Sequence, residues 1–230
     1  MSERRKHKNR QDFIPARESA FFIRFFGWYT KRLFIHRFKH IWLKQHYFPD
    51  SNSRTIYYLN HSSWWDGITP LLLNQYLFRQ NARAMMEDKQ MKQYKFFRWI
   101  GAFSVSLNET RGSVRSLRYA VKSMQRDNAS LFIYPEGKIV PFSTSQPEFQ
   151  GGLNWLYRQL PEVEVVPIGT YIHTLRYNRP EIHIQIGEPV QVNKRLGPGL
   201  QTTLEKALQK QLIELHQYGG FDDAYFLKWF

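Results

Sequence analysis

The 230-residue chain contains no cysteine. That absence excludes a disulfide-stabilised scaffold, a thiolate metal site and a cysteine nucleophile. Acidic residues are scarce, because 19 Asp and Glu stand against 33 Lys and Arg, for a formal net charge of +14. A mean hydropathy of -0.55 excludes an integral membrane protein with many spans. Carboxylate, His, Ser and Lys side chains are left to carry any catalytic chemistry.

Internal repeats and low-complexity linkers are also absent, and the chain is rich in core-forming residues. Hydrophobic side chains make up 42% and aromatic ones 17% of the sequence, which excludes a chain that is disordered overall. A chain of this length can bury the core of one large domain.

The residue periodicity indicates an α/β domain. The predicted elements are strands at residues 54–59, 131–134, 163–166 and 182–186 and helices at residues 67–78 and 111–124. In the second helix, Val114, Leu117, Val121 and Met124 share one face, which we expect to point into the core. Thr202 and Glu205 have the spacing of a capping box and predict the start of a last helix.

The positive charge is concentrated at the N-terminus. Residues 1–44 hold 12 basic and 3 acidic residues, a net charge of +9, and residues 1–18 are short of apolar side chains. We expect residues 1–18 to form a flexible basic arm. A segment with this charge is expected to bind an anionic partner, either nucleic acid or an anionic lipid surface.

Aromatic residues interleaved with these charges favour the lipid surface. No apolar run is long enough to span a bilayer, because Arg24 interrupts it, and the same interruption argues against a secretory signal peptide. Residues 19–44 are predicted to form one kinked or two short amphipathic helices, with the rings on one face and Arg24 and Lys31 roughly opposite. The membrane-interface residues predicted are Phe22, Arg24, Phe25, Phe26, Trp28, Tyr29, Lys31 and Arg32.

A basic aromatic helix of this kind rests in the headgroup layer of a membrane. We therefore expect a peripheral protein on the cytoplasmic side of the cell membrane. The alternative is that the aromatic stripe packs on the core of the domain.

The chemistry of the chain is concentrated after the first predicted strand, where residues 59–67 read Leu-Asn-His-Ser-Ser-Trp-Trp-Asp-Gly. A regular helix would not place His61 and Asp66 on one face, but a strand-to-helix turn can fold the carboxylate back onto the imidazole. A carboxylate on one ring nitrogen fixes the tautomer and leaves the other nitrogen to accept a proton from a hydroxyl. His61 is therefore a candidate general base and Asp66 its orienting partner, with a structural histidine as the alternative.

This motif resembles the His-x-x-x-x-Asp signature of the glycerolipid acyltransferase family, which includes glycerol-3-phosphate and lysophosphatidic acid acyltransferases. Three further blocks follow in the family's order. Residues 101–105 resemble its second block, residues 132–137 its Phe-Pro-Glu-Gly block and residues 165–169 its proline-centred fourth block. The resemblance covers roughly residues 50–190.

The resemblance implies a single domain, residues 45–230, with a mixed β-sheet flanked by helices. It also implies that a fatty acyl group passes from acyl-CoA or acyl-carrier protein to a lipid hydroxyl, with no covalent acyl-enzyme, no metal and no cofactor. Glu136 and Gly137 would line the acceptor site. Ser62 and Ser63 would not be nucleophiles, although a Ser beside a His leaves a hydrolase as an alternative.

Departures from the family pattern concern the acceptor. Phosphate-accepting members carry an Arg at the end of the second block and another just after the Glu-Gly of the third, because guanidinium groups bind phosphate bidentately. This chain has Ser106 and Lys138 at those places, so Arg111 or Arg115 would replace the first Arg and Lys138 the second. Two kinds of acceptor therefore remain as alternatives. One is a lysophospholipid, as in phospholipid biosynthesis, and the other is a non-phosphate lipid such as a glycolipid or glycosylated carotenoid.

A function of another class is a non-catalytic basic protein that binds membranes or nucleic acid on an inactive acyltransferase scaffold. The isoelectric point near 10.0 favours it. The joint presence of His61, Asp66 and Glu136 argues against it, and we expect no nucleic-acid partner.

Overall fold

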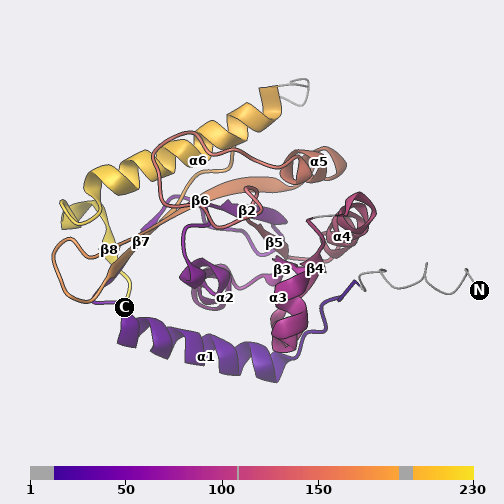
Figure 1. Ribbon diagram of the computed structural model, residues 1–230, viewed down its shortest axis with the longest axis horizontal. Coiled ribbons are helices and arrows are strands. Elements are labelled where there is room, and N and C mark those ends of the chain that lie inside the picture. Colours follow the sequence, from indigo (N-terminus) through magenta and orange to yellow (C-terminus); the bar gives the residue numbers. More distant parts are fainter. Residues whose placement is uncertain (1–12, 108, 192–198) are drawn as a thin grey trace, which may run out of the picture.

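The computed structural model describes residues 13–107, 109–191 and 199–230, so most of the arm expected at residues 1–18 lies outside the described residues. Figure 1 shows one mixed sheet between two layers of helices. The eight strands lie in the order β4-β3-β5-β2-β6-β7-β1-β8. Their bounds are β1 Ile41–Gln45, β2 Thr55–Leu59, β3 Asn81–Glu87, β4 Ala102–Val105, β5 Ala129–Ile133, β6 Glu164–His173, β7 Glu181–Ile186 and β8 Leu227–Lys228. The expected α/β domain with a mixed sheet is confirmed.

Five neighbouring strands run in one direction and form the half of the sheet that positions the site. β4, β3, β5, β2 and β6 are mutually parallel, whereas β7 is antiparallel to β6. The carboxyl ends of β2, β5 and β4 therefore meet at one edge, the edge at which open α/β sheets bind their ligands.

Three helices cover one face of the sheet, namely α4 (Thr110–Ser123), α5 (Gly152–Gln159) and α6 (Gly199–Tyr218) (Figure 1). Leucines of α5 and α6 and the end of α4 pack with β2, β5 and β6 in one hydrophobic cluster. The inward face of α4 is formed by small residues, since Ser116 and Ala120 are buried and the Ser116 hydroxyl donates to the Ser104 carbonyl at 2.9 Å. The predicted inward face of this helix is wrong at Val114, which is exposed.

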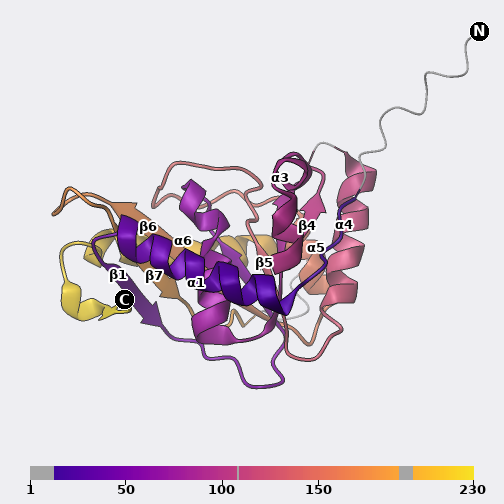
Figure 2. The ribbon, with the colours of Figure 1, turned by 90° about the horizontal axis from the view of Figure 1, so that it is seen from below.

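The opposite face is covered by α1 (Ala20–Arg37) and α2 (Thr69–Leu73), with α3 (Asp88–Gln93) beside them. Figure 2, seen from below, shows α1 running in front of the sheet from the side of β1 toward α4 and α5. Gly27, Thr30 and Phe34 form its buried side. Phe22 and Phe26 stack on Trp99 and Phe96 of the 3-10 segment Lys95–Ile100, at 4.6 and 4.9 Å between ring centroids.

Two boundaries differ from the sequence-based expectation. The segment 19–44 is helical only to Arg37, because Ile41–Gln45 forms β1, which pairs with β7 inside the sheet. α6 begins at Gly199, so Thr202 and Glu205 lie within it and form no capping box. Glu205 instead turns into the core and accepts a hydrogen bond from the Phe149 backbone N–H at 3.0 Å.

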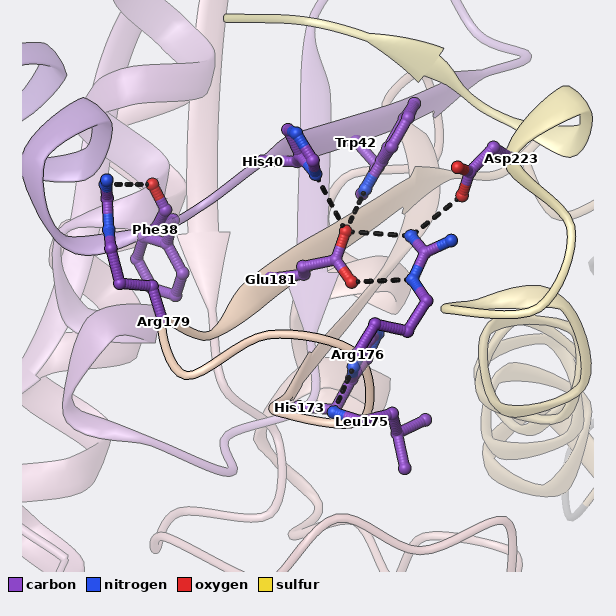
Figure 3. A network of polar contacts seen from close by, with 9 residues as sticks. All are labelled: Phe38, His40, Trp42, His173, Leu175, Arg176, Arg179, Glu181 and Asp223. Atoms are coloured by element: carbon purple, nitrogen blue, oxygen red, sulfur yellow. Dashed lines mark hydrogen bonds and ion pairs between the residues drawn. The ribbon is translucent and has the colours of Figure 1, made fainter.

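A polar network centred on the buried Glu181 ties β7 to β1 and to the C-terminal segment (Figure 3). Glu181 is 1% exposed and accepts hydrogen bonds from the Arg176 guanidinium, the Trp42 indole at 2.9 Å and the His40 ring at 3.1 Å. Burial alone would raise the pKa of Glu181, but these donors outweigh it and lower the pKa to about 2. Arg176 also pairs with Asp223 at 2.8 Å, which secures the end of the chain.

Candidate active site

The loop that follows β2 is anchored to the neighbouring strand β6 by Asn60. Its side-chain amide donates to the Thr170 carbonyl at 2.9 Å and accepts from the Thr170 backbone N–H at 2.8 Å. Asn60 is buried. The ladder between β2 and β6 ends at Leu59 and Ile168, so the Asn60 side chain takes over the hydrogen bonds to the Thr170 backbone. The anchor fixes where the next residues, His61 to Gly67, leave the sheet.

Asp66 lies in the 3-10 turn Trp64–Gly67 and is completely buried. Its Oδ2 accepts the backbone N–H groups of Ser62 and Ser63, both at 2.7 Å. Its Oδ1 lies 3.0 Å from the Thr170 hydroxyl, which donates to it. The turn therefore folds the carboxylate back toward the preceding residues, where two local N–H groups and the Thr170 hydroxyl of β6 hold it.

His61 lies beside that carboxylate, with its Nδ1 3.5 Å from Oδ2 of Asp66. The distance is longer than an ordinary hydrogen bond, and Nδ1 is buried without a hydrogen-bond partner among the described residues. The ring packs on Tyr134 at 4.6 Å between centroids, and the Tyr134 hydroxyl donates to the Asp66 carbonyl. The His61 side chain is 20% exposed, so one side of the ring reaches solvent while the other packs on Tyr134.

The third block brings Glu136 to the same place, at the carboxyl end of β5. Its carboxylate is half-buried and hydrogen-bonds to the His61 backbone. Burial raises the pKa of Glu136, against the opposing effects of that hydrogen bond and of the neighbouring His61 and Lys138 side chains. Gly137 makes the turn with a φ of +71°, a conformation that favours glycine, and Lys138 beyond it is exposed.

The arginines expected near the acceptor lie farther out. Arg111 and Arg115 are exposed on α4, where they line a shallow depression of about 370 Å³ with Val114 and Arg118. The Arg115 guanidinium lies over the Phe13 ring, 5.0 Å from its centroid. Arg111, in the first turn of α4, is the one that stays near the carboxyl ends of the strands.

The predicted interface residues of α1 divide into two groups. Phe25, Trp28 and Tyr29 are exposed together with Phe21, and Arg24 lies among them rather than opposite. Phe22 and Phe26 pack inward, as does Lys31, whose ammonium lies 4.0 Å from the Phe230 ring centroid. Arg32 is exposed, with its guanidinium 5.8 Å from the Trp28 ring centroid.

Comparison with known proteins identifies the family. A family model described as Acyltransferase matches residues 41–171, more than half of the chain. The chain belongs to the acyltransferase family. The matched segment of this acyltransferase contains His61, Asp66, Glu136 and Thr170. No curated protein matches the chain.

A solved structure shares the fold of this acyltransferase. The 1-acyl-sn-glycerophosphate (LPA) acyltransferase PlsC from Thermotoga maritima superposes with a TM-score of 0.60. The match covers 84% of this chain and 79% of that one, at 16% sequence identity. An identity this low shows a common fold.

The acyltransferase has an aromatic-rich, exposed N-terminal helix, consistent with peripheral membrane association. None of the helices in the described part of the chain is long and apolar enough to cross a bilayer.

Proposed function

We propose that this acyltransferase moves a fatty acyl group from a thioester, acyl-CoA or acyl-carrier protein, to the hydroxyl of a lipid. The observation that carries the proposal is the His61–Asp66 pair at the carboxyl edge of the sheet, with Asp66 held on three donors. In this arrangement Nδ1 of His61 faces the carboxylate and Nε2 is left for the acceptor.

The proposed reaction needs no group other than these side chains and the two substrates. Nε2 of His61 takes the proton of the acceptor hydroxyl as its oxygen attacks the thioester carbonyl. The C–S bond breaks, the thiolate leaves, and the imidazolium returns the proton to it, so that an ester and a free thiol result. Asp66 stabilises the imidazolium between the two proton transfers.

Glu136 and Lys138 are proposed to hold the acceptor, supported by their place beside His61. Lys138 would bind the phosphate of a lysophospholipid as a point charge, and Arg111 would bind it through two N–H groups of its planar guanidinium. The alternative acceptor is a non-phosphate lipid alcohol such as a glycolipid, which would need neither cation. Gly137 lets the backbone turn there without a side chain.

The exposed side of α1 is proposed to seat the enzyme on the cytoplasmic surface of the cell membrane, from which it draws its acceptor. Phe21 is 71% and Trp28 54% exposed, and Arg24 and Arg32 lie among these rings. Rings of this kind enter the headgroup boundary while the cations meet anionic lipid.

The test is an acyl-transfer assay with labelled acyl-CoA and acyl-carrier protein against a panel of lipid acceptors. We expect His61→Ala to lower turnover by at least about 10²-fold, the scale of general-base catalysis. The exposed His46 provides a matched control, and His46→Ala should keep wild-type turnover. Wild-type turnover in a folded His61→Ala protein would contradict the mechanism.

The acceptor panel separates the two acceptors. If lysophosphatidic acid is the substrate, Lys138→Ala should raise its KM while His61→Ala lowers kcat. Product on glycolipids alone, unaffected by Lys138→Ala, would identify the neutral acceptor.

A further inference from the structure

The outer side of α4 carries an unbroken row of cations. Arg111, Arg115, Arg118 and Lys122 are spaced by four, three and four residues, so they form one stripe along the helix. All four are exposed, and eleven residues of helix extend the stripe over about 16 Å. We call these four residues the α4 stripe.

The α4 stripe forms no ion pair with an acidic residue in the part of the chain that the structure describes. Neither α4 nor the adjacent α5 contains Asp or Glu. Within residues 13–107, 109–191 and 199–230, no carboxylate forms an ion pair with any of the four side chains. The stripe therefore presents four charges at close spacing that no carboxylate in the described residues pairs, and they repel one another unless an anionic partner covers them.

The position of the stripe indicates a soluble partner rather than a membrane. α4 packs on the same face of the sheet as α5 and α6, and α1 lies on the opposite face (Figure 1). A molecule seated on a bilayer by the exposed side of α1 holds the outer side of α4 away from that bilayer.

The stripe also leads to the reaction site. α4 follows β4, so its first turn lies at the carboxyl edge of the sheet where His61 and Glu136 lie. A Cβ placed on Gly137 would lie 3.8 Å from Leu107 Cδ2, just before α4, so the two turns are neighbours. A partner docked on the stripe can thus deliver a group to His61.

We infer that the α4 stripe is the docking surface for an acidic carrier protein that presents the acyl thioester. The inference rests on the proposed acyl transfer and specifies its donor. A row of four cations over about 16 Å matches the acidic face of a helix, and complementary charge guides such encounters. The phosphates of a free coenzyme occupy a compact site and would not need the far end of the row.

The test compares two charge reversals of equal size. The stripe variant is Arg118→Glu with Lys122→Glu, which leaves the two candidate acceptor residues Arg111 and Arg115 in place. The control variant is Lys89→Glu with Lys92→Glu, two exposed residues of α3, which lies beside α1 and α2. KM and kcat are measured with hexadecanoyl-acyl-carrier protein and with hexadecanoyl-CoA.

We expect the stripe variant to raise KM for the carrier-protein donor at least about tenfold, because like charges now face each other. Its kcat/KM with the CoA donor should stay within about twofold, and the control variant should leave both donors within about twofold. Loss of both donors in the stripe variant, equal losses in the two variants, or no change would each overturn the docking surface.

Binding of acyl-carrier protein, measured by calorimetry at low and high salt, keeps this inference separate from the proposed function. Wild-type protein that binds the carrier in a salt-sensitive way, with the stripe variant not binding, supports the docking surface even if neither donor is turned over. In that case acyl transfer fails and the docking surface stands. Equal binding by the stripe variant overturns it.

Discussion

At the scale of single residues, Thr170 is the group that sequence analysis missed. Its side chain is buried, and its hydroxyl donates to Asp66 across 104 positions of sequence. We expect Thr170→Val to leave Oδ1 of Asp66 without this donor and to lower kcat about tenfold, the equivalent of a hydrogen bond of about 1.4 kcal/mol. Thr170→Ser should restore most of the rate. Steady-state kinetics with hexadecanoyl-CoA checks both values.

The control for Thr170→Val is Thr203→Val on α6, which removes a hydroxyl that donates to the Gly199 carbonyl at 2.9 Å and should leave kcat unchanged. If Thr170→Val kept wild-type kcat, the hydroxyl would have no positioning role. An equal loss in Thr170→Ser would point to packing instead.

At this scale the sequence alone predicts His61 but not Thr170. His61 and Asp66 meet through one local turn, so their spacing and chemistry reveal the pair. Thr170 joins them only because β6 pairs with β2. Strand pairing is a property of the whole sheet, and no local pattern around residue 170 marks it.

At the scale of elements, α1 is the clearest test of membrane association. Periodicity predicted a helix with one aromatic face, but aromatic rings lie on more than one side of α1. Packing on residues 95–100 covers Phe22 and Phe26 and leaves the outward-facing rings exposed. The strand Ile41–Gln45 was missed, because a short apolar run carries no period that separates strand from helix. Removing residues 1–44 would therefore also remove β1, and point substitutions are the sharper test.

We expect Phe21→Ser with Phe25→Ser and Trp28→Ser to weaken binding to anionic vesicles at least about 100-fold, since each ring that enters the boundary contributes on the order of 1.5 kcal/mol. Turnover of a detergent-dispersed acceptor should stay within about twofold. Vesicle sedimentation measures the first effect. Phe221→Ser, an equally exposed ring just after α6, should bind vesicles as the wild type does, and equal binding by the α1 variant would exclude α1 as the contact.

At the scale of the whole molecule, the buried histidine His183 makes stability depend on pH. It lies in β7 with its ring 5.0 Å from that of His173 and 4.7 Å from that of Phe226. Both ring nitrogens are buried without a hydrogen-bond partner in the part of the chain that the structure describes. Burial, and then the neighbouring His173, lower the pKa of His183 to about 3, although Glu181 and Asp223 oppose the shift.

When the pKa of a histidine is lower in the folded than in the unfolded state, its contribution to stability is complete only above the unfolded pKa of about 6.5. The contribution is lost as the pH falls below that value. As the pH falls from 7 to 5, His183 takes up a proton in the unfolded chain but stays neutral in the folded protein. The free energy of unfolding should fall by about 2 kcal/mol through this group alone. Urea unfolding at the two pH values measures the fall. His183→Phe should reduce it by that amount, whereas replacement of the exposed His46 by Gln should not. An unchanged fall in His183→Phe would mean that other groups, such as His173, carry the acid sensitivity of the fold.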